Sequence, residues 1–214
     1  MHTIRMIHKW TGLAIGLSFM FLCFSGLVIV LGKIFNSYAP VFKFAKSFHT
    51  SFLIGEAGKW IISISALLAL IEIISGYIIW GQRTTALCRS LRKQNKSIWT
   101  GIRKNLGFNF PDLLTGLHNS GGFWSGIPLL IMILTCLTWC FGWYGEMVYS
   151  LFAASDTGVL FHTLHALHVG SWWGFLSRLL WLAAVLIGTS LPITGYILFL
   201  RRWKARHTKS YGSH

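Results

Sequence analysis

The sequence has few charged residues, and acidic residues are the scarcest of them. Of its 214 residues 11% are charged, with five Asp and Glu against 19 Lys and Arg, whereas 54% are hydrophobic. A chain with so little charge cannot cover an ordinary water-exposed surface. The composition therefore excludes a typical soluble domain and favours an integral membrane protein.

Several motifs of redox proteins are also missing. There is no Cys-x-x-Cys-His, which excludes a covalently attached c-type haem. No Gly-x-Gly-x-x-Gly follows a strand pattern and opens a helix, so no dinucleotide site is expected. The four cysteines do not imply a disulfide framework, because three of them lie within apolar runs. Electrons for any redox reaction would therefore come from a donor outside this chain.

Long apolar runs are what the sequence has in quantity. A helix needs about 20 such residues to cross roughly 30 Å of hydrocarbon. Four stretches are long enough, near Trp10–Leu31, Trp60–Trp80, Phe123–Met147 and Phe175–Leu200. The first exceeds the apolar core of a signal peptide, so we expect it to remain in the mature protein. The prediction is an all-α integral membrane protein, with residues 1–214 forming one transmembrane domain built as an antiparallel four-helix bundle.

The positive charges are unevenly distributed along the chain. Fourteen of the 19 Lys and Arg lie before the first span, in a loop at about residues 82–117, or after the fourth span. By the positive-inside rule, both termini and this basic loop are predicted to be cytoplasmic. The loop also carries apolar residues, so we expect it to contact the anionic headgroups of the lipid bilayer rather than nucleic acid.

The second half of the chain repeats the first as a hairpin of two helices. At an offset of 119, the matching residues are His49 with His168 and Ser75-Gly76-Tyr77 with Thr194-Gly195-Tyr196. At an offset of 110, they are His8 with His118, Gly12 with Gly122, Gly16 with Gly126 and Ser25 with Thr135. Two like-oriented hairpins are most simply related by a two-fold axis along the membrane normal. The first helix should then lie diagonally opposite the third, and the second opposite the fourth.

Four histidines occupy equivalent positions in this repeat. We expect His8 and His118 at the cytoplasmic ends of the first and third helices, and His49 and His168 at the outer ends of the second and fourth. Paired neutral imidazoles on facing helices are good axial ligands of haem iron. The prediction is two haem b groups, one between each pair. His165, one turn from His168, remains an alternative outer ligand, because register in the repeat is what favours His168.

Glycines follow two of these histidines at i+4 and i+8. They are Gly12 and Gly16 after His8, and Gly122 and Gly126 after His118. A helix face without side chains leaves room beside the ligand, so we predict that these glycines line the space for a flat macrocycle. Close helix contact through Gly-x-x-x-Gly is the alternative.

The remaining candidates are a basic, aromatic outer surface and one carboxylate. The surface, which would take an anionic substrate or else anchor the protein at the membrane interface, comprises Lys33, Lys43, Lys46, Trp172 and Trp173. Glu72 lies within the second span, where an ionisable side chain is a functional candidate. Its role is predicted to be either a proton relay or a simple hydrogen bond, and its partner in the repeat is Leu191.

Four segments resemble the PepSY-associated transmembrane family. I-H-K-W-T-G from Ile7 resembles its opening His-basic-Trp-x-Gly motif, and F-H-T-S-F-L-I-G-E-A-G-K-W from Phe48 resembles its His and Gly-Glu-x-Gly-basic-Trp segment. G-L-H-N-S-G-G-F-W from Gly116 and A-L-H-V-G-S-W-W-G from Ala166 are similar to its two later histidine segments. Asn119 stands where the family often has arginine, and the loop from Gly32 to Lys59 is too short for an inserted PepSY module.

Characterised members of that family include di-haem siderophore reductases of the bacterial inner membrane. The resemblance therefore implies bis-histidine haem b sites at the four histidines and reduction of ferric siderophores or other ferric chelates in the periplasm. The electrons would come from a separate flavin, quinol or protein donor. One alternative is a non-enzymatic cytochrome b subunit of a larger oxidoreductase. A second is a haem-free metal transporter or assembly factor.

Overall fold

The structure, a computed structural model, describes residues 2–35, 39–106, 113–152 and 157–211. Every regular element in these ranges is helical, and four helical segments are long and apolar enough to cross a membrane. They are α1 (His2–Ile34), α3 (Gly55–Lys93), the segment Leu113–Cys140 and α9 (Gly174–Tyr211). The segment Leu113–Cys140 consists of α5 (Leu113–Gly116), the π-helical turn η2 (Leu117–Gly121) and α6 (Gly122–Cys140). The prediction of an all-α protein with four membrane-spanning helices is confirmed.

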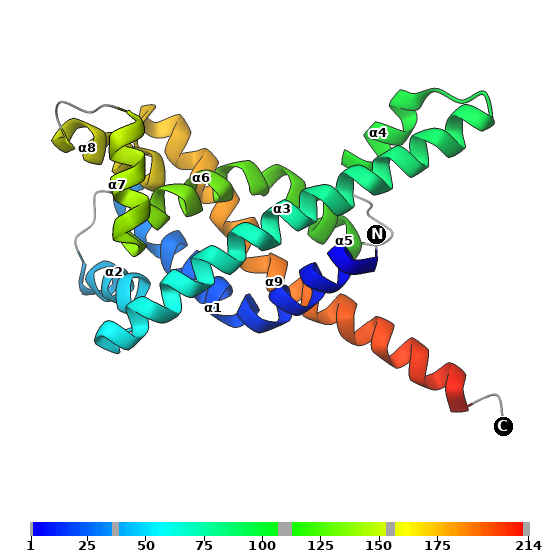
Figure 1. The fold of residues 1–214 in the computed structure, drawn as a ribbon, viewed down its shortest axis with the longest axis horizontal. Coiled ribbons are helices and arrows are strands. Elements are labelled where there is room, and N and C mark those ends of the chain that lie inside the picture. The colour runs from blue at the N-terminus through cyan, green and yellow to red at the C-terminus, as the bar shows by residue number, and fades with distance from the viewer. Residues whose placement is uncertain (1, 36–38, 107–112, 153–156, 212–214) are drawn as a thin grey trace.

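The four long helices pack as the repeat predicts. Both α1 and α6 make their main contacts with α3 and α9, so α1 and α6 lie on one diagonal of the bundle. At the end where the chain begins, α3 and α9 project beyond the bundle (Figure 1). The opposite end carries the short helices α2 (Pro40–Ser51), α7 (Gly142–Leu151) and α8 (Thr157–Val169).

The third membrane helix and the basic segment have different bounds in the structure from those predicted. The third membrane helix begins at Leu113 rather than Phe123 and ends at Cys140 rather than Met147, because Phe141 is extended (φ −129°, ψ 112°). The basic segment expected as a loop at 82–117 is largely helical, since α3 continues to Lys93 and α4 (Ile98–Leu106) packs back against it. Good helix formers such as Arg, Leu and Lys allow this continuation. Residues 107–112 of that segment lie outside the described residues.

A matched pair of tyrosines joins the two hairpins. The hydroxyl of Tyr77 on α3 donates to the carbonyl of Phe123 on α6 at 2.8 Å, and that of Tyr196 on α9 donates to the carbonyl of Leu13 on α1 at 2.8 Å. Tyr196 is equivalent to Tyr77 at the offset of 119, and Phe123 to Leu13 at the offset of 110. The duplication seen in the sequence is therefore also a duplication of tertiary contacts.

Gly16 and Gly126 are the positions where these tyrosines cross the neighbouring helix. A Cβ atom at Gly16 would lie 2.7 Å from the hydroxyl oxygen of Tyr196, and one at Gly126 would lie 2.5 Å from that of Tyr77. Both distances are too short for any larger residue. These contacts fit the close-contact alternative for the two glycines, and their place beside a macrocycle stays a prediction.

Gly12 and Gly122 also face side chains of an adjacent helix. A Cβ atom at Gly12 would lie 2.7 Å from Oε1 of Glu72, and one at Gly122 would lie 3.6 Å from a methyl carbon of Leu191. The predicted space for a macrocycle beside His8 and His118 is therefore bordered by the repeat-equivalent residues Glu72 and Leu191. Small residues here let neighbouring helices approach, as they do in other membrane bundles.

The close contact at Gly16 gives a stability prediction. Gly16→Leu should lower the free energy of unfolding by about 1–3 kcal/mol, because the added side chain displaces the Tyr196 ring and its hydrogen bond. Gly81→Leu is the matched control, since no atom lies within 4 Å of a Cβ atom at Gly81. Thermal unfolding in detergent, followed by circular dichroism, measures both. Equal melting temperatures for the two variants would contradict the close packing.

Candidate functional site

The first histidine pair lies between α1 and the π-helical turn of the third membrane helix. The ring centroids of His8 and His118 are 6.3 Å apart, their planes are inclined by 70°, and both residues are half-buried. A π-helical turn widens the helix by one residue and is frequent at functional sites. The turn places His118 within a membrane helix, whereas the sequence prediction had this helix start after it.

The second pair lies at the opposite end of the bundle, on two short helices. The ring centroids of His49 on α2 and His168 on α8 are also 6.3 Å apart, with the planes inclined by 59°. We had expected these residues at the outer ends of the second and fourth helices. Instead the chain breaks after each histidine at a residue of positive φ, Phe52 (47°) in one half and Gly170 (70°) in the other. Each break lets a short helix turn its histidine into the bundle.

All four histidines are held through Nδ1 by a hydroxyl of their own hairpin. The partners are Ser75 for His8 (3.0 Å), Thr194 for His118 (3.0 Å), Ser25 for His49 (2.8 Å) and Thr135 for His168 (3.1 Å). Ser75 and Thr194 are equivalent at the offset of 119, and Ser25 and Thr135 at the offset of 110. The sequence analysis aligned these residues without giving them a role. The sequence feature that could have identified them is that both halves carry a hydroxyl residue, serine or threonine, at equivalent positions.

These hydroxyl contacts favour the proton on Nδ1 of each imidazole. Each hydroxyl also donates its own proton to a carbonyl of its own helix; the acceptors are Glu72 for Ser75, Ser190 for Thr194, Phe21 for Ser25 and Ile131 for Thr135. The hydroxyl oxygen can then accept from Nδ1–H. In the case of His168, the carbonyl of Met132, which can only accept, lies 2.9 Å from Nδ1 as well. In that tautomer, the distal nitrogen Nε2 is left with a free lone pair on every ring.

Burial keeps the second pair neutral. Burial lowers the pKa of His49, and burial together with the neighbouring His49 lowers the pKa of His168 to about 4. Both imidazoles are therefore uncharged near neutral pH. Within the described chain, none of the four Nε2 atoms forms a hydrogen bond. A neutral imidazole with an unused lone pair is the form that binds a metal.

Two tryptophans that the sequence analysis missed position His168. The Trp139 ring packs edge-on against His168, with centroids 5.3 Å apart. Trp181 is 1% exposed, and its Nε1 donates to the carbonyl of His168 at 3.2 Å. Trp181 stands where the first half has Ile62, so comparison of the two halves could not reveal it.

The structure places His168, and not His165, opposite His49. His165 is exposed and stacks on Phe161 with centroids 6.3 Å apart and an interplanar angle of 16°. Its pKa is lowered by burial and then by the nearby charges of Lys33, Lys46 and His162. His165 therefore belongs to the surface beside the second pair rather than to the pair.

Part of the predicted outer surface comes together around His165. Lys33 is within electrostatic reach of Lys46 and of Arg178, and Nη1 of Arg178 donates to the carbonyl of Lys33 at 3.3 Å. We call Lys33, Lys46 and Arg178 the cationic cluster. Among the described residues, ion pairs join Lys59 to Glu56 and His8 to Glu72, so the cluster has no carboxylate partner there.

The other residues of that predicted surface lie outside the cationic cluster. Lys43 is exposed on α2. Trp172 and Trp173 stack on each other in the turn between α8 and α9, and they are 47% and 65% exposed. This position fits the anchoring alternative for the two tryptophans.

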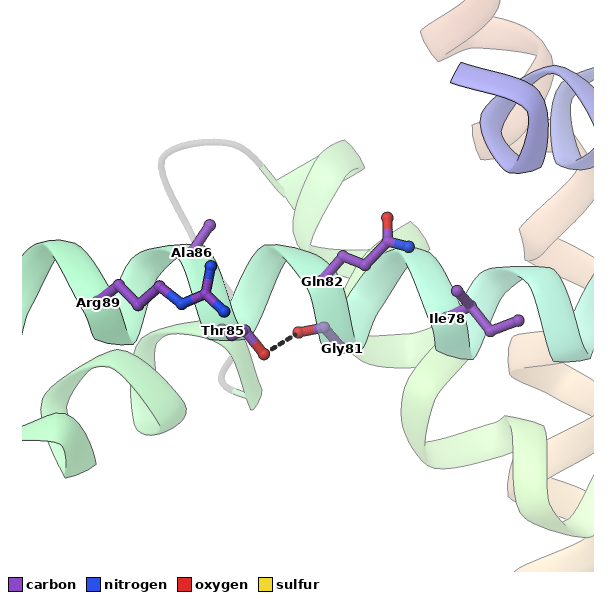
Figure 2. Close-up of a pocket in the computed structure, with 6 residues that line it drawn as sticks. All are labelled: Ile78, Gly81, Gln82, Thr85, Ala86 and Arg89. Atoms are coloured by element: carbon purple, nitrogen blue, oxygen red, sulfur yellow. Dashed lines mark hydrogen bonds between the residues drawn. The ribbon is translucent and has the colours of Figure 1, made fainter. Parts of the chain in front are cut away.

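A hollow elsewhere on the molecule does not involve the histidines. Figure 2 shows it along the projecting part of α3, where one helix face lines it; the residues are Ile78, Gly81, Gln82, Thr85, Ala86 and Arg89. The Thr85 hydroxyl donates to the carbonyl of Gly81, within the same helix. A single helix face cannot surround a ligand, so the histidine pairs remain the candidate site.

Fold and site together define a multi-pass helical membrane protein of two repeated hairpins, with a histidine pair near each end. The family model described as PepSY-associated TM region matches residues 29–159. This is more than half of the chain, and the protein belongs to that family. The match includes His49 and His118. Comparisons with curated proteins and with solved structures give no match.

The junction between α8 and α9 gives a second stability prediction. Gly170 and Gly174 both have positive φ (70° and 64°), so alanine costs about 1–2 kcal/mol of strain at either. At Gly170 the added Cβ would also lie 2.6 Å from Cγ of Trp181, whereas at Gly174 nothing lies within 4 Å. Gly170→Ala should therefore destabilise the protein by about 1–3 kcal/mol more than Gly174→Ala, as measured by thermal unfolding. An equal loss would mean that Trp181 does not pack as described.

Proposed function

We propose that this protein holds two haem b groups, one between His8 and His118 and one between His49 and His168, and moves electrons across the bacterial inner membrane. Electrons would pass from the cytoplasmic side to the periplasmic side, where a ferric siderophore or another ferric chelate accepts them. Both termini are then cytoplasmic. The observation that carries the proposal is the equal ring separation in two pairs of imidazoles that are all held through Nδ1.

The ring separation matches a metal ion placed between the imidazoles. A metal–imidazole bond is about 2.0–2.1 Å, and the nitrogen lies about 1.1 Å from its ring centroid, so two imidazoles across one metal have centroids about 6.2–6.4 Å apart. A direct hydrogen bond between two imidazoles would bring the centroids to about 5 Å. It would also need a proton on one Nε2. Edge-to-face contact allows 6.3 Å, but it explains neither the repeated value nor the four Nδ1 contacts.

The number of protein ligands favours haem over a bare metal ion. A structural zinc site takes about four protein ligands. Among the described residues, no group of three or more His, Cys, Asp or Glu is placed to hold a metal ion. Two trans imidazoles suit an iron whose other four ligands come from a porphyrin. Bound haem would supply a one-electron couple between ferric and ferrous iron, and the chain contributes the axial ligands and their orientation.

The position of the pairs supports transfer across the bilayer. His8 and His118 lie near the end with the projecting, arginine-rich parts of α3 and α9, which the positive-inside rule assigns to the cytoplasm. The pair His49 and His168 lies at the other end, beside the cationic cluster. Unpaired cations attract anions and raise their local concentration, so a negatively charged ferric chelate is the acceptor that this surface favours.

Haem content tests the ligand assignment. His8→Ala and His118→Ala should each reduce the haem-to-protein ratio of the purified protein from two to one, because each removes one axial ligand of the same site. His165→Ala should retain both haems, since His165 lies outside the pairs. The ratio is measured from the visible spectrum of the extracted haem and the protein concentration. A loss of haem in His165→Ala, with retention in His118→Ala, would overturn the assignment.

Stopped-flow spectroscopy tests the reductase activity. Dithionite-reduced protein mixed with an anionic ferric chelate should reoxidise, and Lys46→Glu should slow the second-order rate roughly threefold to tenfold at low salt by reversing a charge of the cationic cluster. The control is Lys96→Glu, which makes the same change of charge at the opposite end of the bundle, in the turn between α3 and α4. Haem that stays reduced in the wild-type protein would instead favour the cytochrome b subunit. Equal slowing in both variants would exclude the cationic cluster as the approach surface.

A further inference from the structure

The two hairpins differ beside the first histidine pair. Glu72 lies against Gly12, and its repeat equivalent Leu191 lies against Gly122, which is itself equivalent to Gly12. One site in the duplicated scaffold therefore holds a carboxylate where its counterpart holds an isobutyl group. The change is local, because the hydroxyl contacts to the histidines are retained in both halves.

Glu72 is bound on both of its oxygens. Oε1 lies 3.0 Å from Nδ1 of His8, and Oε2 accepts from the hydroxyl of Thr11 at 2.5 Å. The residue equivalent to Thr11 in the second half is Gly121, so the hydroxyl that orients the carboxylate is absent there too. The hydroxyl of Thr11 and the space beside Gly12 together form a site that holds the carboxylate of Glu72. It faces the ring of His8.

This contact distinguishes His8 from the other three histidines. Across the described residues, Glu72 is the carboxylate within ion-pair distance of a histidine. A carboxylate this close to a ligand imidazole places negative charge beside the metal that the imidazole binds. Negative charge stabilises ferric over ferrous iron and so lowers the reduction potential of that metal.

We propose that Glu72 is a positioning residue that makes the His8–His118 centre the lower-potential centre of the two. This inference depends on the proposed function. An electron on the lower-potential centre moves downhill to the His49–His168 centre, so the carboxylate sets the direction of transfer from the cytoplasmic to the periplasmic side. The alternative is a hydrogen bond that only joins α1 to α3, which would affect stability and leave the potentials unchanged.

The test is a redox titration of the purified, haem-loaded protein. Glu72→Leu copies the second half of the repeat, and it should shift the reduction equilibrium of one haem about tenfold toward the ferrous form, which is about 59 mV for a one-electron couple. The other haem should keep its midpoint potential. Glu72→Gln, nearly the same in shape, should shift the same haem in the same direction, and Glu72→Asp should restore part of the wild-type value.

Two further variants test whether the carboxylate changes the potential of the haem at the first histidine pair. Leu191→Glu adds a carboxylate beside His118 and should shift the same haem the opposite way, toward the ferric form. Glu56→Gln, at the other end of the bundle and paired with Lys59, is the control and should leave both potentials unchanged. Repeating the Glu72 titration in a His49→Ala background, which retains the first centre alone, identifies the haem that moves. Electron paramagnetic resonance of the ferric protein should show changed g values for that haem.

The outcomes separate the two proposals. If Glu72→Leu and Glu72→Gln bind two haems and both midpoint potentials stay at their wild-type values, Glu72 does not set the potential, whereas the haem assignment stands. A shift of the His49–His168 centre would overturn the inference as well. If the wild-type protein binds no haem, both proposals are wrong. If Glu72→Leu does not fold, the redox titration of Glu72→Gln provides the test.

Discussion

The hydrogen bond from a histidine Nδ1 to a serine or threonine of the same hairpin is the contact on which the rest of the site depends. The hydroxyl gives its own proton to a helix carbonyl, so it can accept from the ring. This favours the tautomer with the proton on Nδ1. Under the proposed function, a metal ion between the paired rings would bind both Nε2 lone pairs. The bundle then serves to hold two rings at that separation.

Duplication of the hairpin explains why this arrangement occurs twice, and departures from it give the two ends different chemistry. The tyrosine contacts at Gly16 and Gly126 are the same in both halves, so they belong to the scaffold. Glu72 has Leu191 as its equivalent in the second half, and the cationic cluster lies beside the second pair. Glu72 places a negative charge at the first pair and the cluster places positive charges beside the second. Under the proposed function, these asymmetrical charges on a symmetrical scaffold would favour electron transfer in one direction.

Much of the fold was predictable because apolar run length and an ungapped repeat constrain membrane helices strongly. The four spans, the diagonal arrangement and the pairing of His49 with His168 all follow from residues aligned at two offsets. The helix ends were not predictable, because the break at Phe141 and the π-helical turn at His118 are set by local backbone packing rather than by hydropathy. The neighbours of the glycines were not predictable either. Sequence spacing shows that a helix face lacks side chains, but it cannot show that Tyr77 or Tyr196 from another helix fills the space.

The most direct measurement is the haem content and visible spectrum of the wild-type protein purified from membranes in a mild detergent. The account predicts two non-covalently bound b-type haems per chain, both low-spin because each iron has two imidazole ligands. Reduction should give sharp α and β bands, and carbon monoxide should leave them unchanged. A folded, four-helix protein without a Soret band, or with a single high-spin haem that binds carbon monoxide, would contradict the paired-imidazole site.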